Sequence, residues 1–246
     1  MTNVVPLEPV AAPHPGEPHV AGGLSGRLNQ LRAGVLGAND GIVSTAALVV
    51  GVAATTTSSG AILAAGMAGA VAGAVSMALG EYVSVSTQRD TERSLLAYER
   101  LELEQFPERE LEELTALYEA KGLTPGTARQ VALELTAKDA FAAHADAELH
   151  IDPDALTSPW QAAVASAISF ALGAALPLLA ILLPPPGSRI PIAFVAVVLA
   201  LTVTGAVSAR LGSAGVVRAV SRLVAGGALA MAVTFGIGQL VSTLVG

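Results

Sequence analysis

One carboxylate, Asp40, stands within a stretch that is otherwise apolar enough to cross a lipid bilayer. An ionisable side chain in hydrocarbon is costly, so such residues usually face a protein interior, a water-filled cavity or an ion path. Asn39 and Ser44 are the nearest polar residues in the chain that could serve as partners for a buried acid. The sequence therefore predicts that Asp40 lies on an ion path, with Asn39 and Ser44 beside it.

A second carboxylate, Glu81, lies near the end of the next apolar stretch, and Met77 precedes it by about one helical turn. Asp40 follows Arg32 at the same separation at which Glu81 precedes Arg89. In two antiparallel helices, both carboxylates would then lie about 12 Å from a charge at the same membrane face. Two carboxylates and a thioether suit a borderline transition-metal ion. The alternative is an interfacial Glu81 and a Met77 that packs in the core.

A third set of candidate ligands lies in a charged segment farther along the chain. Its members form three pairs, each sharing a helix face: Glu99 with Glu102, Glu110 with Glu113, and His144 with Glu148. Three helices offering oxygen and imidazole ligands could enclose one or more divalent cations, which would relieve the repulsion among the acids. Glutamate is also common on solvated helix faces, so spacing alone leaves open a domain without metal.

The composition indicates an integral membrane protein. Of the 246 residues, 52% are hydrophobic and only 13% are charged, which is too apolar for a soluble domain of this length. The chain has no cysteine, which excludes disulfides and thiolate metal sites. The formal net charge is −7, and sixteen of the twenty acids lie between Asp90 and Asp154. Such an acidic patch suits cations and disfavours nucleic acid.

Five apolar segments have the length of about twenty residues or more that a bilayer requires: 33–54, 61–82, 160–183, 190–211 and 217–245. We expect an all-α membrane protein with five transmembrane helices and a three-helix cytoplasmic domain inserted between the second and third spans. Gly37 and Gly41 in the first span, like Gly69 and Gly73 in the second, have the spacing that permits close helix packing. Pro177 predicts a kink in the third span.

Proline and glycine divide the charged segment into three predicted helices. The first continues from the second span to Gln105, the second runs from Pro107 to Lys121, and the third runs from Thr124 to about Leu149. The predicted organisation is a disordered cytoplasmic tail at 1–26, two spans at 27–83, an acidic metal-binding domain at 84–156, and spans three to five at 157–246.

The basic residues predict an orientation. With five spans, twelve of the thirteen Lys and Arg residues lie on the side of the acidic domain, and only Arg189 lies on the other. By the positive-inside rule, the N terminus and this domain are cytoplasmic and the C terminus is outside. The short tail, without an organelle signal, and the compact loops lead us to expect a prokaryotic cell (inner) membrane.

These segments resemble the vacuolar iron transporter family, whose members export divalent iron and manganese from the cytosol. The resemblance covers the chain from Leu31 onward and is most specific in NDGIVST at 39–45, SMALGEYVSV at 76–85 and QRD at 88–90. It implies a homodimer of five-span subunits whose first helices line the path. It also implies that Asp40 is the path carboxylate, that Met77 and Glu81 line the cytoplasmic entrance, and that the paired glutamates of the acidic domain bind metal.

The chain departs from the family pattern in two places, which together involve three positions. Some members carry adjacent methionines before the final glutamate of the third domain helix, where this chain has His144 and Ala145 and retains Glu148. Some also carry an acid four residues before the Met77 position, which here is Gly73. The first departure removes soft thioether ligands and bears on ion preference, and the second bears on proton coupling.

The predicted function is transport of Fe²⁺ or Mn²⁺ out of the cytosol in exchange for protons. The metal is then a transported substrate rather than a permanently bound cofactor, and the partners are the lipid bilayer and a second copy of the chain. One alternative is a membrane-anchored carboxylate di-iron oxidase or iron-storage protein. The other is a transporter whose acidic domain is only structural or regulatory. Carboxylate di-iron sites characteristically contain Glu-x-x-His pairs, which this sequence lacks, so we expect no enzyme.

Overall fold

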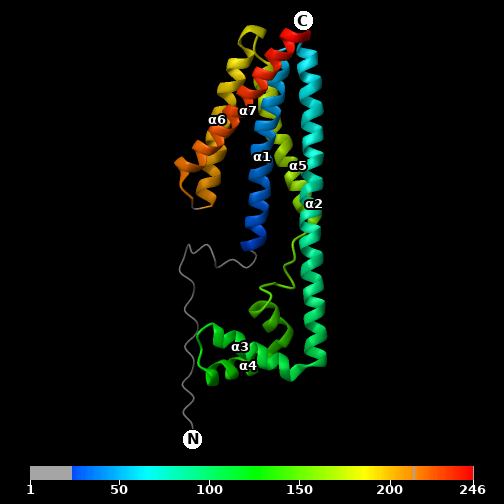
Figure 1. Cartoon of the computed structure of the whole chain (residues 1–246), viewed down its shortest axis with the longest axis vertical. Coiled ribbons are helices and arrows are strands. Elements are labelled where there is room, and N and C mark those ends of the chain that lie inside the picture. The colour runs from blue at the N-terminus through cyan, green and yellow to red at the C-terminus, as the bar shows by residue number, and fades with distance from the viewer. Residues whose placement is uncertain (1–23, 213, 246) are drawn as a thin grey trace.

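The computed structural model describes residues 24–212 and 214–245, with side chains from residue 33 to residue 244 within those ranges. Nearly all of the predicted tail, 1–26, lies outside the described residues. The elements are α1 (Leu24–Ala53), α2 (Ser59–Gln105), α3 (Pro107–Ala120), α4 (Pro125–Ala147), α5 (Pro159–Leu182), the short 3-10 helix η2 (Pro186–Ser188), α6 (Arg189–Leu211) and α7 (Val216–Val245) (Figure 1). Five of the helices, α1, α2, α5, α6 and α7, are long and apolar enough to cross a membrane. The prediction of an all-α chain with five such helices is confirmed for the described residues.

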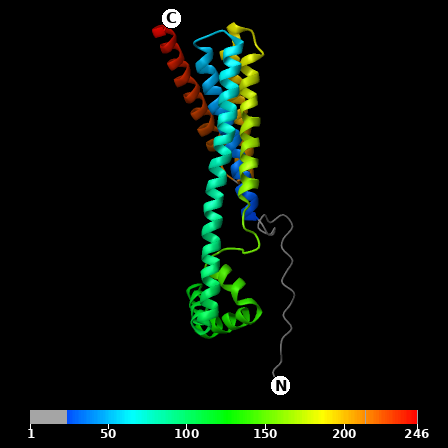
Figure 2. The ribbon, with the colours of Figure 1, turned by 90° about the vertical axis from the view of Figure 1, so that its right-hand side faces the viewer.

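The five apolar helices form one bundle, and α3 and α4 lie beyond its end (Figures 1 and 2). Helix α1 packs against the other four helices of the bundle. Each helix contributes a fully buried side chain to the same apolar core: Val49, Ile62, Ile181, Val197 and Met231. Burial of this apolar surface fixes the position of α1, which carries Asp40.

Close backbone packing between α1 and α5 explains two of the glycines. A Cβ atom at Gly41 would overlap the carbonyl oxygen of Phe170, and one at Gly173 would overlap the carbonyl oxygen of Ala38. The prediction that Gly41 serves close helix packing is therefore confirmed, with α5 as the neighbour. This packing places α5 directly beside the turn of α1 that holds Asp40.

Helix α2 is one continuous helix of 47 residues, about 70 Å long at 1.5 Å per residue. At its start the hydroxyl of Ser58 accepts a hydrogen bond from the backbone N–H of Ala61. At its end Phe106 leaves the helical conformation immediately before Pro107. The predicted continuation from the second span to Gln105 is confirmed, and it extends α2 well beyond the bundle (Figure 2).

The third predicted domain helix is interrupted, which the sequence analysis did not anticipate. Asp139 has extended backbone angles, φ −166° and ψ 96°, inside α4. Its side-chain Oδ1 accepts a hydrogen bond of 2.9 Å from the backbone N–H of Ala142 and so caps the helical segment that follows. The predicted single helix from Thr124 to Leu149 is therefore wrong at this point. The bend sets the direction of the short segment that carries His144.

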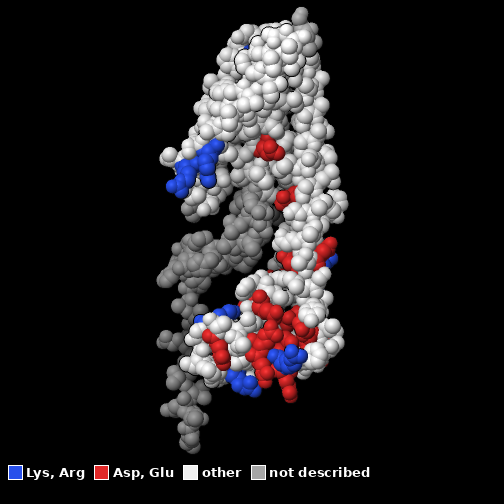
Figure 3. All heavy atoms as spheres, viewed as in Figure 1, with Lys and Arg blue, Asp and Glu red and all other residues white. Residues whose placement is uncertain are grey.

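The charged side chains are distributed unevenly over the molecule. Acidic residues gather over α3, α4 and the end of α2, whereas most of the visible face of the bundle is uncharged (Figure 3).

Tyr82 and Trp160, whose ring centroids lie 4.8 Å apart, pair at the end of the bundle nearer to α3 and α4. At the opposite end, buried Arg189 donates hydrogen bonds to the carbonyl oxygens of Thr57 and Pro184 and to the hydroxyl of Ser59. Arg189 thus ties the connection between α1 and α2 to the connection between α5 and α6.

Candidate metal and ion-path sites

Four of the six predicted metal ligands come together where α2, α3 and α4 meet. Glu99 lies on α2, Glu110 on α3 and His144 on α4, and Glu148 directly follows α4. The Nδ1 atom of His144 lies 3.0 Å from Oε1 of Glu99, 3.7 Å from Oε2 of Glu110 and 3.7 Å from Oε2 of Glu148. One imidazole nitrogen is therefore surrounded by three carboxylates. We call these four residues the acidic cluster.

Several polar atoms of the acidic cluster are buried and have no hydrogen-bond partner among the residues that the structure describes. They include both ring nitrogens of His144, Oε1 of Glu99 and Oε2 of Glu148. Although Nδ1 of His144 and Oε1 of Glu99 are only 3.0 Å apart, their alignment does not make a hydrogen bond. Buried polar atoms are normally bonded, because leaving one unpaired is costly. The orphaned atoms are all of the kinds that ligate divalent metals.

Three of the four residues of the acidic cluster lie close enough together to hold a single ion. Ligand atoms of Glu99, His144 and Glu148 all lie within 4.8 Å of one another. Metal–ligand bonds to nitrogen and oxygen are about 2.0–2.6 Å long, so one ion between these atoms could touch each of them. The three residues present two carboxylates and an imidazole, a donor set suited to Fe²⁺, Mn²⁺ or Zn²⁺.

Burial and mutual repulsion raise the pKa values of the carboxyl groups in the acidic cluster. Burial is the largest cause for Glu99, followed by repulsion from Glu148, Glu110 and Glu102, and together they raise the pKa of Glu99 from 4.5 to about 7. The pKa of Glu110 is also raised, first by burial and then by Glu113 and Glu102. A divalent cation would remove the repulsion that produces part of these shifts.

Glu102 and Glu113 lie at the edge of the acidic cluster. They are close enough to raise the pKa of Glu110. Like Glu110, neither belongs to the group of three residues whose ligand atoms all lie within 4.8 Å of one another, but Glu110 contacts His144 Nδ1 at 3.7 Å. Glu102 is half-buried and Glu113 is exposed. Helix spacing identified all six residues, but spacing does not say which member of each pair turns inward.

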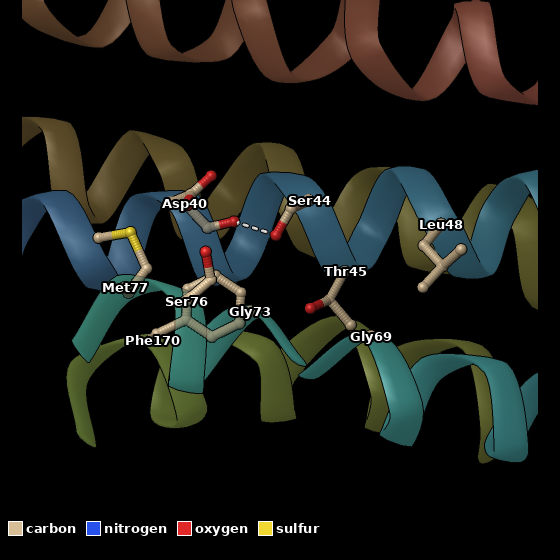
Figure 4. A pocket seen from close by; sticks show the side chains of 9 residues that line it. All are labelled: Asp40, Ser44, Thr45, Leu48, Gly69, Gly73, Ser76, Met77 and Phe170. Carbon is tan, nitrogen blue, oxygen red and sulfur yellow. Dashed lines mark hydrogen bonds between the residues drawn. The ribbon is translucent and has the colours of Figure 1, made fainter. Parts of the chain in front are cut away.

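Asp40 lines a cleft of about 260 Å³ between α1, α2 and α5 (Figure 4). The residues that line the cleft are Asp40, Ser44, Thr45, Leu48, Gly69, Gly73, Ser76, Met77 and Phe170. The Ser44 hydroxyl donates a hydrogen bond of 2.6 Å to the backbone carbonyl oxygen of Asp40. The Ser44 hydroxyl is therefore bonded to the main chain of α1 and not to the Asp40 carboxylate.

Met77 rather than Glu81 faces Asp40 across the cleft. Asp40, Gly73 and Met77 line the same hollow, whereas Glu81 follows Met77 by one turn and is not part of its lining. Asn39 also lies outside the lining, and its buried side-chain oxygen has no hydrogen-bond partner in the described part of the chain. The cleft that contains Asp40 and Met77 therefore does not include Glu81, and the similar depth expected for Asp40 and Glu81 stays a prediction.

Besides its two glycines, the cleft includes four residues that were not predicted as part of the site. Phe170 comes from α5, Thr45 and Leu48 come from α1, and Ser76 comes from α2. A Cβ atom at Gly73 would overlap the ring of Phe170, so the ring occupies the space that an acid at this position would need. Ser76 and Thr45 belong to the segments that carry the family resemblance, but nothing in the sequence indicated Phe170.

Comparisons with known proteins cover almost all of the described chain. The sequence model of the VIT family matches residues 31–239. A vacuolar iron transporter of Acanthamoeba castellanii is 44% identical over 226 residues, which are 89% of this chain and 81% of the relative. Vacuolar iron transporter homolog 1 of Oryza sativa subsp. japonica is 41% identical over 87% of this chain and 75% of the relative. Vacuolar iron transporter homolog 2.1 of Arabidopsis thaliana is 37% identical over 88% and 84%, respectively.

Proposed function

The chain belongs to the VIT family, and on that premise we propose that it transports Fe²⁺ or Mn²⁺ out of the cytosol in exchange for protons. The family resemblance seen in the sequence is confirmed by these comparisons. The relatives bear the names of transporters, so the expectation that the chain is not an enzyme is confirmed at the level of the family. Its five apolar helices agree with an integral membrane protein.

The proposal depends mainly on one observation: a single helix contributes residues both to the cleft and to the acidic cluster. Helix α2 contributes Met77 to the cleft and Glu99 to the acidic cluster. The acidic cluster offers metal ligands outside the bundle, and the cleft offers a carboxylate and a thioether inside it. An ion collected at the first site could then enter the second, as transport requires.

Each site has a separate role in the proposal. The domain at 84–156, built from the end of α2 with α3 and α4, concentrates divalent ions at the cytoplasmic face through its acids. Glu99, Glu110, His144 and Glu148 bind the ion, with Glu102 and Glu113 adding negative charge around them. The ion is a substrate that passes on, rather than a cofactor that stays.

Asp40 is the path carboxylate in this mechanism. It replaces part of the hydration shell of the ion, and the sulfur of Met77 lies in the same cleft as a softer ligand. Glu81, one turn toward the acidic domain, lines the entrance, while Asn39 and Ser44 shape the turn of α1 around Asp40. Metal and proton compete for the same carboxylates, so a proton gradient can drive exchange.

An exposed stripe on α1 supports a homodimer. Leu36, Asp40, Ser44 and Leu48 follow one another at four-residue spacing, and all four are exposed in the single chain. A carboxylate facing lipid is costly. A second copy that covers this stripe would place the two Asp40 residues on either side of a shared path.

The orientation follows from the basic residues. Arg210, Arg218 and Arg222 flank the connection between α6 and α7, and the positive-inside rule places that end of the bundle in the cytoplasm. The N terminus and the acidic domain are then cytoplasmic, and the C terminus is outside. We expected a prokaryotic cell membrane, whereas the names of the eukaryotic relatives refer to a vacuole. In either membrane this orientation carries metal out of the cytosol.

Reconstituted vesicles test the proposal directly. The purified chain is inserted into liposomes with an imposed proton gradient, and Fe²⁺ and Mn²⁺ uptake is recorded with a metal-sensitive dye. We expect uptake that depends on the gradient and is lost in Asp40→Ala. Thr202→Ala, which changes an exposed polar residue of α6 outside the cleft, serves as the control and should transport normally. Metal uptake that changes neither with the proton gradient nor in Asp40→Ala would overturn the proposal.

A further inference from the structure

A second hollow of about 260 Å³ lies farther along α1, toward the end of the bundle that carries the C terminus. It is bounded by α1 from Ala47 to Val52, by Thr55 and by α7 from Thr234 to Val241. Its two hydroxyl groups are already bonded to the backbone, since Thr55 donates to the carbonyl of Val52 and Thr234 donates to those of Ala230 and Met231. This hollow is therefore apolar in its chemistry and offers an ion no free side-chain ligand.

Leu48 is the side chain that the two hollows share. It lines the cleft of Asp40 on one side and the apolar hollow on the other. A Cβ atom at Gly69 of α2 would overlap the Cδ2 atom of Leu48, so the Leu48 side chain packs directly against Gly69. Leu48 thus closes the polar cleft beyond Asp40 and Ser44, and unfilled apolar space lies immediately behind it.

We propose that Leu48 is the gate of the path, and that the apolar hollow beside α7 receives its side chain when the path opens. This inference rests on the proposed transport function. In the position described, an aliphatic group blocks a hydrated ion, because no ligand there can replace the lost water and narrow apolar constrictions exclude water as well. Rotation away from Gly69 would move the leucine side chain out of the cleft and into the apolar hollow, and so remove the block.

Transport assays with three variants test both parts of the proposal. Leu48→Ala removes the block, so metal should leak several-fold faster without a gradient, and coupling to protons should fall. Val241→Phe fills the receiving hollow, so gradient-driven transport should fall several-fold while metal binding to the acidic cluster is unchanged. Val233→Phe is the matched control, because Val233 is exposed on the same helix but does not line the hollow.

The double variant separates gating from general damage. A small side chain at position 48 does not need the hollow, so Leu48→Ala combined with Val241→Phe should leak as Leu48→Ala alone does. If Val241→Phe lowers transport equally in both backgrounds, or if Leu48→Ala does not leak, the proposal is wrong. Unaltered Mn²⁺ binding and thermal unfolding show that each variant is folded.

Thiol labelling tests the gate without relying on transport. The sequence has no cysteine, so Ser44→Cys introduces a single reactive group in the cleft. A charged, membrane-impermeant thiol reagent applied from the side of the C terminus should label Ser44→Cys only when Leu48→Ala is also present. Labelling that is equal in both backgrounds would overturn the gate. Vesicles in which the unmodified chain moves neither Fe²⁺ nor Mn²⁺ would overturn the proposed function, and this labelling would still decide the gate.

Discussion

His144 of α4 and Glu99 of α2 approach each other within 3.0 Å, although neither forms a hydrogen bond with the other. The two side chains are buried, and their closest atoms are an imidazole nitrogen and a carboxylate oxygen, which can both ligate a metal ion. Buried polar atoms without a hydrogen bond destabilise the fold, whereas a cation that both side chains ligate would pair with these atoms. The acidic cluster is therefore expected to order around a bound ion.

Removal of His144 tests this expectation. In His144→Ala we expect Mn²⁺ affinity to fall by at least about tenfold, since even the loss of an outer partner of a ligand has that effect. Isothermal titration of the full chain in detergent measures the change. Asp146→Ala, which changes an exposed acid on the same helical segment, should leave the affinity unaltered. Equal effects of the two substitutions would mean that the acids act only through their summed charge.

The raised pKa of Glu99 predicts the pH dependence of metal binding. Glu99 holds a proton below its pKa of about 7, and a metal ion must displace that proton. Affinity should therefore rise with pH and level off above about pH 7. In Glu99→Gln the rise near neutral pH should become shallower. Titrations at several pH values check this, and an unchanged slope in Glu99→Gln would contradict it.

The same shift has the opposite effect on the stability of the metal-free protein. Because the pKa of Glu99 in the folded protein, about 7, exceeds its ordinary value of 4.5, the folded state binds the proton more tightly than the unfolded chain does. This contribution is fully present below pH 4.5 and is lost as the pH rises through about 7. Added Mn²⁺ should restore the loss at neutral pH, which thermal unfolding with and without metal can measure.

Met77 gives a test of the softer ligand in the cleft. Met77→Leu keeps a similar volume, so the free energy of unfolding should change by less than about 1.5 kcal/mol, while loss of the sulfur should slow transport. Met67→Leu is the control, because Met67 is an exposed methionine on the same helix outside the cleft. Initial rates of Fe²⁺ uptake distinguish the two. Equal rates in Met77→Leu and the unmodified chain would show that Met77 only packs.

The contact of α1 with α5 predicts an effect on stability. In Gly41→Ala the new methyl group would overlap the backbone of Phe170, so the free energy of unfolding should fall by about 1–3 kcal/mol. At Gly80 a Cβ atom meets nothing within 4 Å. Gly80→Ala should therefore be neutral or stabilising, because alanine favours a helix more than glycine does. Chemical denaturation in detergent compares the two variants.

The bend in α4 predicts a link between folding and metal binding. Asp139→Ala removes the cap on the backbone N–H of Ala142, which should cost about 1 kcal/mol of stability. Because this segment carries His144, Mn²⁺ affinity should fall as well. Lys138→Ala, a change at the exposed neighbouring position, should affect neither quantity. Unaltered Mn²⁺ binding in Asp139→Ala would show that the acidic cluster forms without the cap.

Length and hydropathy were enough to predict the five apolar helices, because a helix that crosses a bilayer must be long and continuously apolar. Helix periodicity was enough to identify Glu99, Glu110, His144 and Glu148 as possible ligands. It could not predict the break at Asp139, since an isolated aspartate does not disturb a helical pattern. It also could not show that Met77, not Glu81, faces Asp40, or that Phe170 covers Gly73, because these contacts depend on the rotation and shift of neighbouring helices.

The hydrogen bond from Arg189 to Ser59 fixes α2 at its first residue. This fixed end is a fulcrum, that is, a point about which the helix could tilt. Met77 lies about 27 Å along α2 from Ser59 and Glu99 lies about 60 Å along it. A small tilt about the fulcrum would therefore move Glu99 about twice as far as Met77. If an ion binds at Glu99 as proposed, a tilt that it causes there would be transmitted along α2, with a smaller displacement, to the wall of the cleft opposite Asp40.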